Sequence, residues 1–277
     1  MNFGLLIIGD EILSGKREDK HLPKVIALLA ARGLALSWAR YVGDDPTRIT
    51  ADLRDALASG DIVFSCGGIG ATPDDHTRQC AAAALGVALE LHPQARDLIL
   101  ERMRDMAREQ GTAHDLDSDA SRHRLNMGVF PQGAEIIPNP YNKIPGFAVR
   151  PPAAGTPAAG PRAGVYFVPG FPVMAWPMME WVLDGHCAAL HRPLVTTERS
   201  VIVFGAMEAA LTPTMEAIEA RFPGIKVFSL PSVDHPQWGR HIELGVKGSL
   251  EQLETAYAAL RIALDAHGAP LGPELVR

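Results

Sequence analysis

The sequence predicts an α/β fold, a doubly wound and mostly parallel sheet, followed by a small α+β domain. Short apolar runs such as Phe3–Gly9 and Ile62–Phe64 have the length and composition of buried strands. Apolar residues at helical spacing separate these runs, and such alternation is typical of parallel sheets with helices on both faces. Acidic or glycine-rich turns follow three of the strands, so we expect them to gather at one edge of the sheet.

Composition narrows the classes of function. The chain has 277 residues and a hydrophobic fraction of 47%, which suits one large or two ordinary packed domains. A net charge of -6 gives no electrostatic reason to expect nucleic-acid binding. No membrane span or signal peptide is recognisable, so we expect a cytoplasmic protein. The three cysteines lack metal-ligand spacing, and Cys66 is either a nucleophile or a small buried residue.

The stretch from Asp61 to Cys80 reads as a strand, a glycine loop and the start of a helix. The strand is followed by Gly67 and Gly68, where backbone without a Cβ can turn sharply. The tetrapeptide Thr-Pro-Asp-Asp at 72–75 combines a capping hydroxyl, a proline and two acids. This combination predicts a helix from residue 72 to residue 85, ended by Gly86.

The glycine loop and the helix start together predict a phosphate site. Backbone N–H groups at a helix start are free to bind an anion, and the helix dipole favours negative charge there. We expect the glycines of this loop to lie against phosphate and the nearby threonines to donate hydroxyls to it. These residues are Gly67, Gly68, Gly70, Thr72 and Thr77.

The two acids after the glycine loop predict a metal ion. Asp74 and Asp75 would repel a phosphate unless a cation lay between them. A divalent ion can bridge carboxylate and phosphate oxygens, and Mg²⁺ is the first candidate, with Mn²⁺ or Co²⁺ as alternatives. The simpler alternative is that both acids only stabilise the start of a helix.

Other loops carry further candidates. Acidic turns follow the first two predicted strands, at 10–11 and at 43–46. A turn-rich segment at 138–147 suits a loop that shapes a pocket, and its Lys143 could pair with an anionic ligand. Arg122, His123 and Arg124 could reach a phosphate or could form a solvated face.

The last part of the chain changes character. Residues 1–191 are predicted to form the sheet domain, with an exposed loop at 150–164, and residues 192–277 a separate β-α-β-β-α unit that begins with a strand at 195–204. The segment 232–236 holds Asp234 and His235, either as a catalytic pair or in a surface loop between strands.

Five short motifs occur in a fixed order. The central one is G-G-I-G-A-T-P-D-D-H-T at 67–77, and the others lie at 9–15, at 42–45, at Asn139 with 145–147, and at 169–174. Together they resemble the MoCF (molybdopterin-binding, molybdenum-cofactor biosynthesis) domain family in its CinA type. The sequence departs from the family pattern at His21, Ala71 and Ile144. It has no counterpart of the deamidase domain of longer CinA proteins, so the resemblance implies no deamidation of nicotinamide mononucleotide.

The resemblance implies a MogA-like three-layer α/β/α sheet that binds molybdopterin or a nucleotide diphosphate. It implies that Asp44 and Asp75 are catalytic and that Asp44, Asp74 and Asp75 are the metal ligands. It also places the residues of the other matched motifs at the ligand. These are Gly9, Glu11, Asn139, Pro145, Gly146, Pro169 and Gly170.

Three functions follow from this resemblance. The first is metal-dependent hydrolysis of a nucleotide pyrophosphate such as ADP-ribose. The second is binding of molybdopterin or a nucleotide without catalysis, and the third is adenylyl transfer to molybdopterin. Apolar residues around Trp176 and Trp181 further suggest a homodimer.

Overall fold

The computed structural model describes residues 1–111, 118–151, 163–192 and 198–277. The chain forms two compact units, Met1–Pro193 and Leu194–Arg277. The predicted domain boundary at 191–192 lies within two residues of this division. Parts of two predicted segments, residues 152–162 of the loop and 195–197 of the strand, lie outside the described ranges.

A six-stranded sheet forms the centre of the first unit, with strand order β2-β1-β3-β8-β7-β6. The first four strands in this order are parallel, and β7 pairs antiparallel with both β8 and β6. Strands β1, β3 and β8 are buried along their whole length, as their apolar sequences predict. The strand bounds are β1 Phe3–Ile8, β2 Leu36–Val42, β3 Ile62–Cys66, β6 Glu135–Ile137, β7 Gly146–Val149 and β8 Gly164–Val168. The mostly parallel sheet is therefore confirmed.

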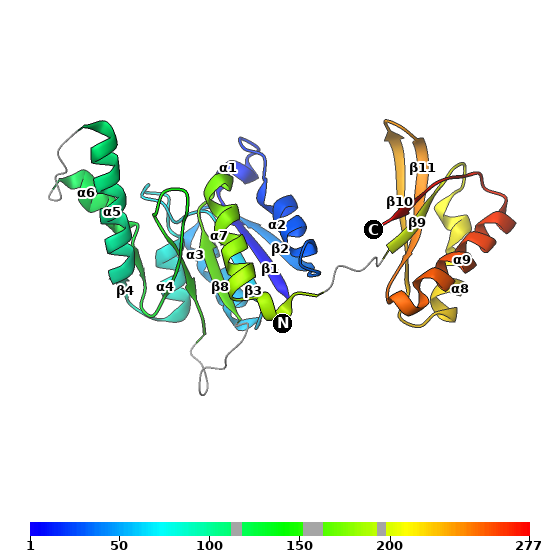
Figure 1. Cartoon of the computed structure of the whole chain (residues 1–277), viewed down its shortest axis with the longest axis horizontal. Coiled ribbons are helices and arrows are strands. Elements are labelled where there is room, and N and C mark those ends of the chain that lie inside the picture. The colour runs from blue at the N-terminus through cyan, green and yellow to red at the C-terminus, as the bar shows by residue number, and fades with distance from the viewer. Residues whose placement is uncertain (112–117, 152–162, 193–197) are drawn as a thin grey trace. The chain divides into compact units, whose positions relative to one another are not determined.

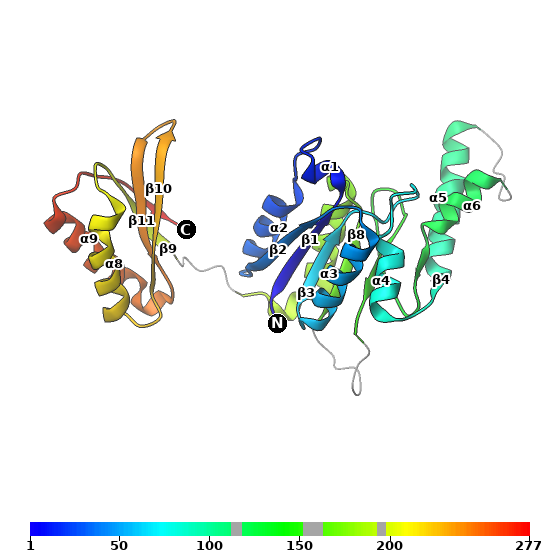
Figure 2. The ribbon, with the colours of Figure 1, turned by 180° about the vertical axis from the view of Figure 1, so that it is seen from behind.

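Helices cover both faces of this sheet (Figures 1 and 2). On one face, α2 (His21–Ala30) and α7 (Pro172–Gly185) pack on strand residues such as Leu5. On the other face, α3 (Pro46–Ala58) and α4 (Thr77–Leu85) pack on its neighbour Leu6. Successive strand residues point to opposite faces, so the two cores are separate. The result is the predicted three-layer arrangement.

Helix α4 begins later than the sequence predicts. It starts at Thr77 rather than at Thr72, while Gly86 ends it in the left-handed conformation as expected. The carboxylate of Asp75 accepts hydrogen bonds from the backbone N–H and the hydroxyl of Thr72, at 2.8 and 2.5 Å. The N–H of Asp75 also donates to the Thr72 carbonyl at 3.0 Å, so residues 72–75 form a local turn where the first helical turn is expected.

Smaller elements extend the first unit. Helix α5 and the short helix α6 pack on each other around Ile99 and Met103, and β4 pairs with β5 in a small sheet that the sequence does not predict. A short helix follows β1, and a 3-10 turn follows α7. Their bounds are α1 Asp10–Leu13, β4 Leu89–Leu91, α5 Pro93–Gln110, α6 Asp119–Asn126, β5 Val129–Pro131 and η1 Ala188–Leu190.

The second unit is an antiparallel sheet of order β10-β11-β9-β12, packed on two helices around one apolar core. Strand β12 is not predicted from the sequence. The bounds are β9 Glu198–Val203, α8 Glu208–Arg221, β10 Lys226–His235, β11 Gly239–Lys247, α9 Leu250–His267 and β12 Leu271–Val276. No helix in the described ranges is long and apolar enough to cross a bilayer.

Candidate functional site

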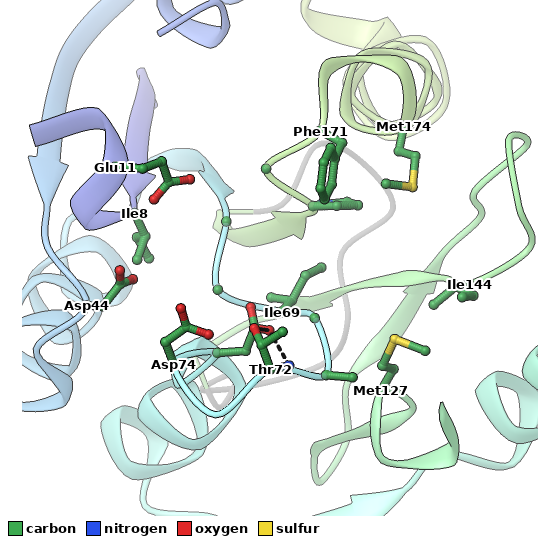
Figure 3. Close-up of a pocket in the computed structure, with 18 of the residues that line it drawn as sticks. Ile8, Glu11, Asp44, Ile69, Thr72, Asp74, Met127, Ile144, Phe171 and Met174 are labelled. Atoms are coloured by element: carbon green, nitrogen blue, oxygen red, sulfur yellow. Dashed lines mark hydrogen bonds between the residues drawn. The ribbon is translucent and has the colours of Figure 1, made fainter. Parts of the chain in front are cut away.

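A pocket of about 380 Å³ lies where β1, β2, β3 and β8 end at one edge of the sheet (Figure 3). Loops that follow these four strands line it, as the strand-end turns predict. Most of the predicted site residues line this pocket. They are Gly9, Glu11, Asp44, Gly67, Gly68, Gly70, Thr72, Asp74, Asp75, Asn139, Pro145, Pro169 and Gly170.

Carboxylates form one wall of the pocket. Glu11, Asp44 and Asp74 lie together on the side nearest β1 and β2 in Figure 3. Burial raises the pKa of Asp44, and the like charges of Asp10, Glu11 and Asp74 raise it further, while a backbone hydrogen bond from Asp10 opposes the shift. The wall therefore attracts cations.

Residues outside the pocket lining help to fix the shape of the glycine loop. Gly67 and Gly68 have φ values of +105° and +66°, and a Cβ on Gly67 would lie 2.2 Å from the carbonyl oxygen of Ile8. The fully buried Thr77 donates its hydroxyl to the Gly67 carbonyl at 3.1 Å and its N–H to the Gly68 carbonyl at 3.0 Å. Thr77 thus supports the loop and does not line the pocket.

A buried arginine holds the far end of the same loop. The guanidinium of Arg78 donates to the carbonyl oxygens of Gly70 and Asn126, at 2.7 and 2.5 Å. Only 6% of this residue is exposed. Because Met127, the next residue after Asn126, lines the pocket, Arg78 links the glycine loop to the wall that α6 leads into.

Apolar side chains form the opposite wall. Met127, Ile144, Phe171 and Met174 lie on this side of the pocket in Figure 3. Motif reasoning missed them as a group, because they come from three separate segments and share no spacing. The available signals were the 169–174 motif, which contains Phe171 and Met174, and the position of Ile144 directly before Pro145.

Asparagines set the shape of the loop before β7. Asn139, 4% exposed, donates to the side chain of Asn142 at 2.8 Å and to the Ile144 carbonyl at 2.9 Å. Asn142 in turn accepts from the Ile144 N–H at 3.0 Å. Asn139 therefore lines the pocket with its side chain already engaged by its own loop.

The structure places two other predicted ligand residues outside this pocket lining. The Lys143 ammonium lies 2.6 Å from Glu101 and 2.6 Å from Asp105 of α5, and these carboxylates raise its pKa. Gly146 is enclosed in the core, where a Cβ would lie 2.3 Å from the Phe167 carbonyl oxygen. Gly146 thus allows two strands to approach closely.

The remaining candidates also lie away from the pocket. Cys66 is buried in β3, and burial raises the pKa of its thiol, which favours the structural interpretation. Arg122, His123 and Arg124 lie on α6 and do not line the pocket. His235 accepts from the N–H groups of Gln237 and Trp238, both at 3.3 Å, at the end of β10.

Within the part of the chain that the structure describes, no three His, Cys, Asp or Glu side chains are close enough together to hold a metal ion by themselves. The acidic wall still fits a divalent cation by its chemistry, since oxygen ligands of like charge surround Asp44. Mg²⁺ commonly binds to one or two carboxylates and completes its shell with substrate phosphates and water.

Comparison with known proteins agrees with this architecture. A family model described as "Probable molybdopterin binding domain" matches residues 4–191. A CinA-like protein of Anaeromyxobacter sp. (strain K) is 34% identical over 184 residues, covering 66% of this chain and 40% of the relative. A protein of Caldivirga maquilingensis is 29% identical over 253 residues, covering 90% of this chain and 89% of its own.

A solved structure shares the fold of the first unit. The crystal structure of CinA from Thermoplasma acidophilum, a protein of unknown function, has 26% identity and a TM-score of 0.53, and covers 66% of this chain and 96% of that one. The chain spans about two fifths of the length of the first CinA-like relatives it matches. The chain belongs to the molybdopterin-binding domain family and is related to the CinA-like proteins.

Proposed function

We propose that the first unit is a metal-dependent hydrolase that cleaves the pyrophosphate of a nucleotide such as ADP-ribose. The division of one pocket into an acidic wall and an apolar wall, with the glycine loop between them, carries this proposal (Figure 3). A nucleotide diphosphate matches both walls, because its planar ring can lie against the apolar wall while its phosphates reach a metal ion at the acidic wall. A pocket of about 380 Å³ suits a ligand of this size class.

The acidic wall would hold the metal ion. Asp44 and Asp74 face the same part of the pocket, and Asp75 adjoins them in the glycine loop. We propose that one or two of these three carboxylates bind the ion, since no three of them form a cluster in the described residues, with phosphate oxygens of the substrate completing the shell. When bound, a divalent ion withdraws charge from the pyrophosphate and lowers the pKa of water.

Residues of the chain would orient the reacting groups. Residues 68–70 of the glycine loop would present backbone N–H groups to the phosphates, whereas the N–H of Gly67 is bonded to the Val168 carbonyl at 3.1 Å; Thr72 lies beside them in the pocket lining. Asp44 lines the pocket and would orient the attacking water and accept its proton. Water adds to one phosphorus, and ADP-ribose yields AMP and ribose 5-phosphate.

A second candidate is binding of molybdopterin or a nucleotide without catalysis. One observation favours it: the Asp75 carboxylate is already bonded to the backbone and hydroxyl of Thr72 within its own loop. In this alternative Asp75 has a structural role. Adenylyl transfer to molybdopterin would use the same pocket and would require ATP.

The deciding experiment is incubation of the purified chain with ADP-ribose and Mg²⁺, Mn²⁺ or Co²⁺ in turn. We expect AMP release with at least one metal and none with a chelator. If calorimetry shows bound ADP-ribose but no AMP forms with any metal, the binding function replaces the hydrolase. Product formed only from ATP and molybdopterin would indicate adenylyl transfer.

We also propose that the protein forms a homodimer. Trp181 on α7 is 42% exposed, whereas Trp176 is partly buried against the core with Lys24 over its ring at 5.2 Å. The exposed indole is the kind of residue that interfaces bury. Sedimentation velocity should show a dimer for the natural chain and a monomer for Trp181→Glu; a monomeric natural chain would contradict this.

A further inference from the structure

Arg17 adds a cationic side chain to a pocket lining whose other side chains are acidic, neutral polar or apolar. Among the described residues that line the pocket, it is the one Lys or Arg. It lies in the loop after α1, and its N–H donates to the carbonyl of Glu11 at 3.0 Å. Helix α1 and the loop after it therefore present a carboxylate and a guanidinium to the same cavity. The motifs that resemble known families do not include Arg17.

The Arg17 guanidinium has an aromatic rather than an acidic partner among the residues that the structure describes. Other arginines of this unit are paired, as Arg32 is with Asp184 at 2.6 Å and Arg40 is with Asp52 at 2.8 Å. Arg17 instead lies over the ring of Phe171, 5.8 Å from its centroid, and makes no ion pair with any residue in the described ranges. Its donors are available to an anion in the pocket.

Phe171 presents an aromatic ring to the pocket, with this guanidinium over one of its faces. It follows the Pro169-Gly170 turn, and its carbonyl accepts from the N–H groups of Met174 and Ala175 at 3.0 and 2.9 Å as α7 begins. These bonds fix the backbone, while 54% of the residue remains exposed. An aromatic ring held in this way is suited to stacking on a planar heterocycle.

We infer that Arg17 and Phe171 form a metal-independent clamp for a phosphorylated planar heterocycle. Phe171 stacks on the heterocycle, and Arg17 binds its phosphate as a charge-assisted pair. This deepens the proposed function and rests on a nucleotide-like ligand entering this pocket. In this proposal the metal ion contacts only the part of the ligand at the acidic wall, and the clamp holds the rest of the ligand. The product AMP should therefore bind in the absence of metal.

Calorimetry with AMP, in the presence of a chelator, tests this clamp on the full chain. Arg17→Ala should weaken AMP binding about tenfold, the usual size of a hydrogen-bonded charge contact. Lys16→Ala removes the same charge one residue away, outside the pocket lining, and should change affinity less than about twofold. Arg17→Lys should recover part of the loss. Thermal melting of each variant verifies folding.

A second pair of variants tests the role of the Phe171 ring in the clamp. Phe171→Leu keeps apolar volume without a ring and should weaken AMP about tenfold, whereas Phe171→Trp should retain binding. Ribose 5-phosphate should lose the dependence on Phe171, and adenosine the dependence on Arg17. A pterin phosphate, which has the same chemistry, is titrated alongside AMP, and the tighter ligand identifies the heterocycle.

Two results would overturn the clamp: neither AMP nor the pterin phosphate binds the natural chain without metal, or Arg17→Ala and Lys16→Ala weaken binding equally. The hydrolase proposal fails separately. Metal-independent binding that depends on Arg17, together with no AMP release from ADP-ribose, leaves the clamp intact and removes only the hydrolase.

Discussion

Asp10 and Asp44 each hold the other's backbone. The N–H of Asp10 donates to the Asp44 carboxylate at 2.9 Å, and the N–H of Asp44 donates to the Asp10 carboxylate at 3.2 Å. This exchange joins the loop after β1 to the loop after β2 and fixes two like charges side by side. These two hydrogen bonds hold the acidic wall in place. The folded protein therefore keeps the Asp10 and Asp44 carboxylates close together despite their electrostatic repulsion.

Asp44→Asn should stabilise the fold while abolishing hydrolysis. The asparagine oxygen can still accept from the Asp10 N–H, but the charge that Asp10, Glu11 and Asp74 repel is removed. We expect a higher melting temperature at pH 7 and a loss of AMP release of about 100-fold or more. Asp45→Asn, which removes the neighbouring charge, is the control.

The same variant has a predicted pH dependence. Because the folded pKa of Asp44 lies above its ordinary value of 3.8, the folded state binds the proton more tightly than the unfolded chain. The penalty from the charged form is complete above the folded pKa and absent below about 3.8. The advantage of Asp44→Asn in melting temperature should therefore shrink as the pH falls; a constant difference would contradict this assignment.

Asp75→Asn separates the catalytic role from the structural one. The asparagine oxygen can accept from the Thr72 N–H as the carboxylate does, so the loop should keep its shape. A catalytic Asp75 predicts that AMP release falls about 100-fold or more while ADP-ribose affinity, measured by calorimetry with a chelator, changes little. Full turnover in this variant would remove Asp75 from the mechanism.

Thr77→Val should weaken ligand binding through the glycine loop. Valine has the same shape but leaves the Gly67 carbonyl without its hydroxyl donor, which costs about 1–2 kcal/mol of stability. Thr77→Ser keeps the donor and loses a methyl group. Calorimetry with AMP should show reduced affinity for the valine variant and near-normal affinity for serine. Equal losses would indicate that packing, rather than the hydrogen bond, sets the loop.

Arg78→Met should loosen the contact between the loop and α6. Two carbonyl oxygens, of Gly70 and Asn126, would lose their donor, so we expect a loss of about 2 kcal/mol in urea unfolding. Arg54→Met is a matched control, since Arg54 is exposed and reaches a single carbonyl, of Ala83, at 3.4 Å. A loss of similar size in both variants would show that Arg78 is not a specific link.

Sequence reasoning predicted the sheet and the acidic side of the site because both depend on local patterns. Buried strands such as β3 are continuous apolar runs, and strand-end loops of a parallel sheet must meet at one edge. The predicted start of α4 at Thr72 is wrong, and the reason also lies in the local sequence. Residues that favour a helix start also favour a side-chain turn, and Asp75 made the turn with Thr72.

The apolar wall and β12 depend on contacts that sequence spacing does not encode. Met127 and Ile144 reach the pocket only because α5, α6 and the loop before β7 pack together. Strand β12 contains a glycine and a proline, which read as a loop, yet it pairs with β9 at the edge of the sheet, where proline is tolerated. The sequence predicts Lys143 as a ligand residue, but in the folded chain its ammonium is paired with Glu101 and Asp105 of α5, which lie about forty residues away in the sequence.

The position of β8 between β3 and β7 sets the order in which the molecule can assemble. Ile62 pairs with Gly164, and the N–H of Gly67 donates to the carbonyl of Val168, so the glycine loop leans on a strand made much later in synthesis. Closing so long a loop is entropically costly and slow. A nascent chain that has passed Cys80 carries the whole central motif, and β1 to pair with β3 on one side, but it still lacks β8 on the other side. The ability to bind a ligand must therefore arise late in folding, after β8 has docked.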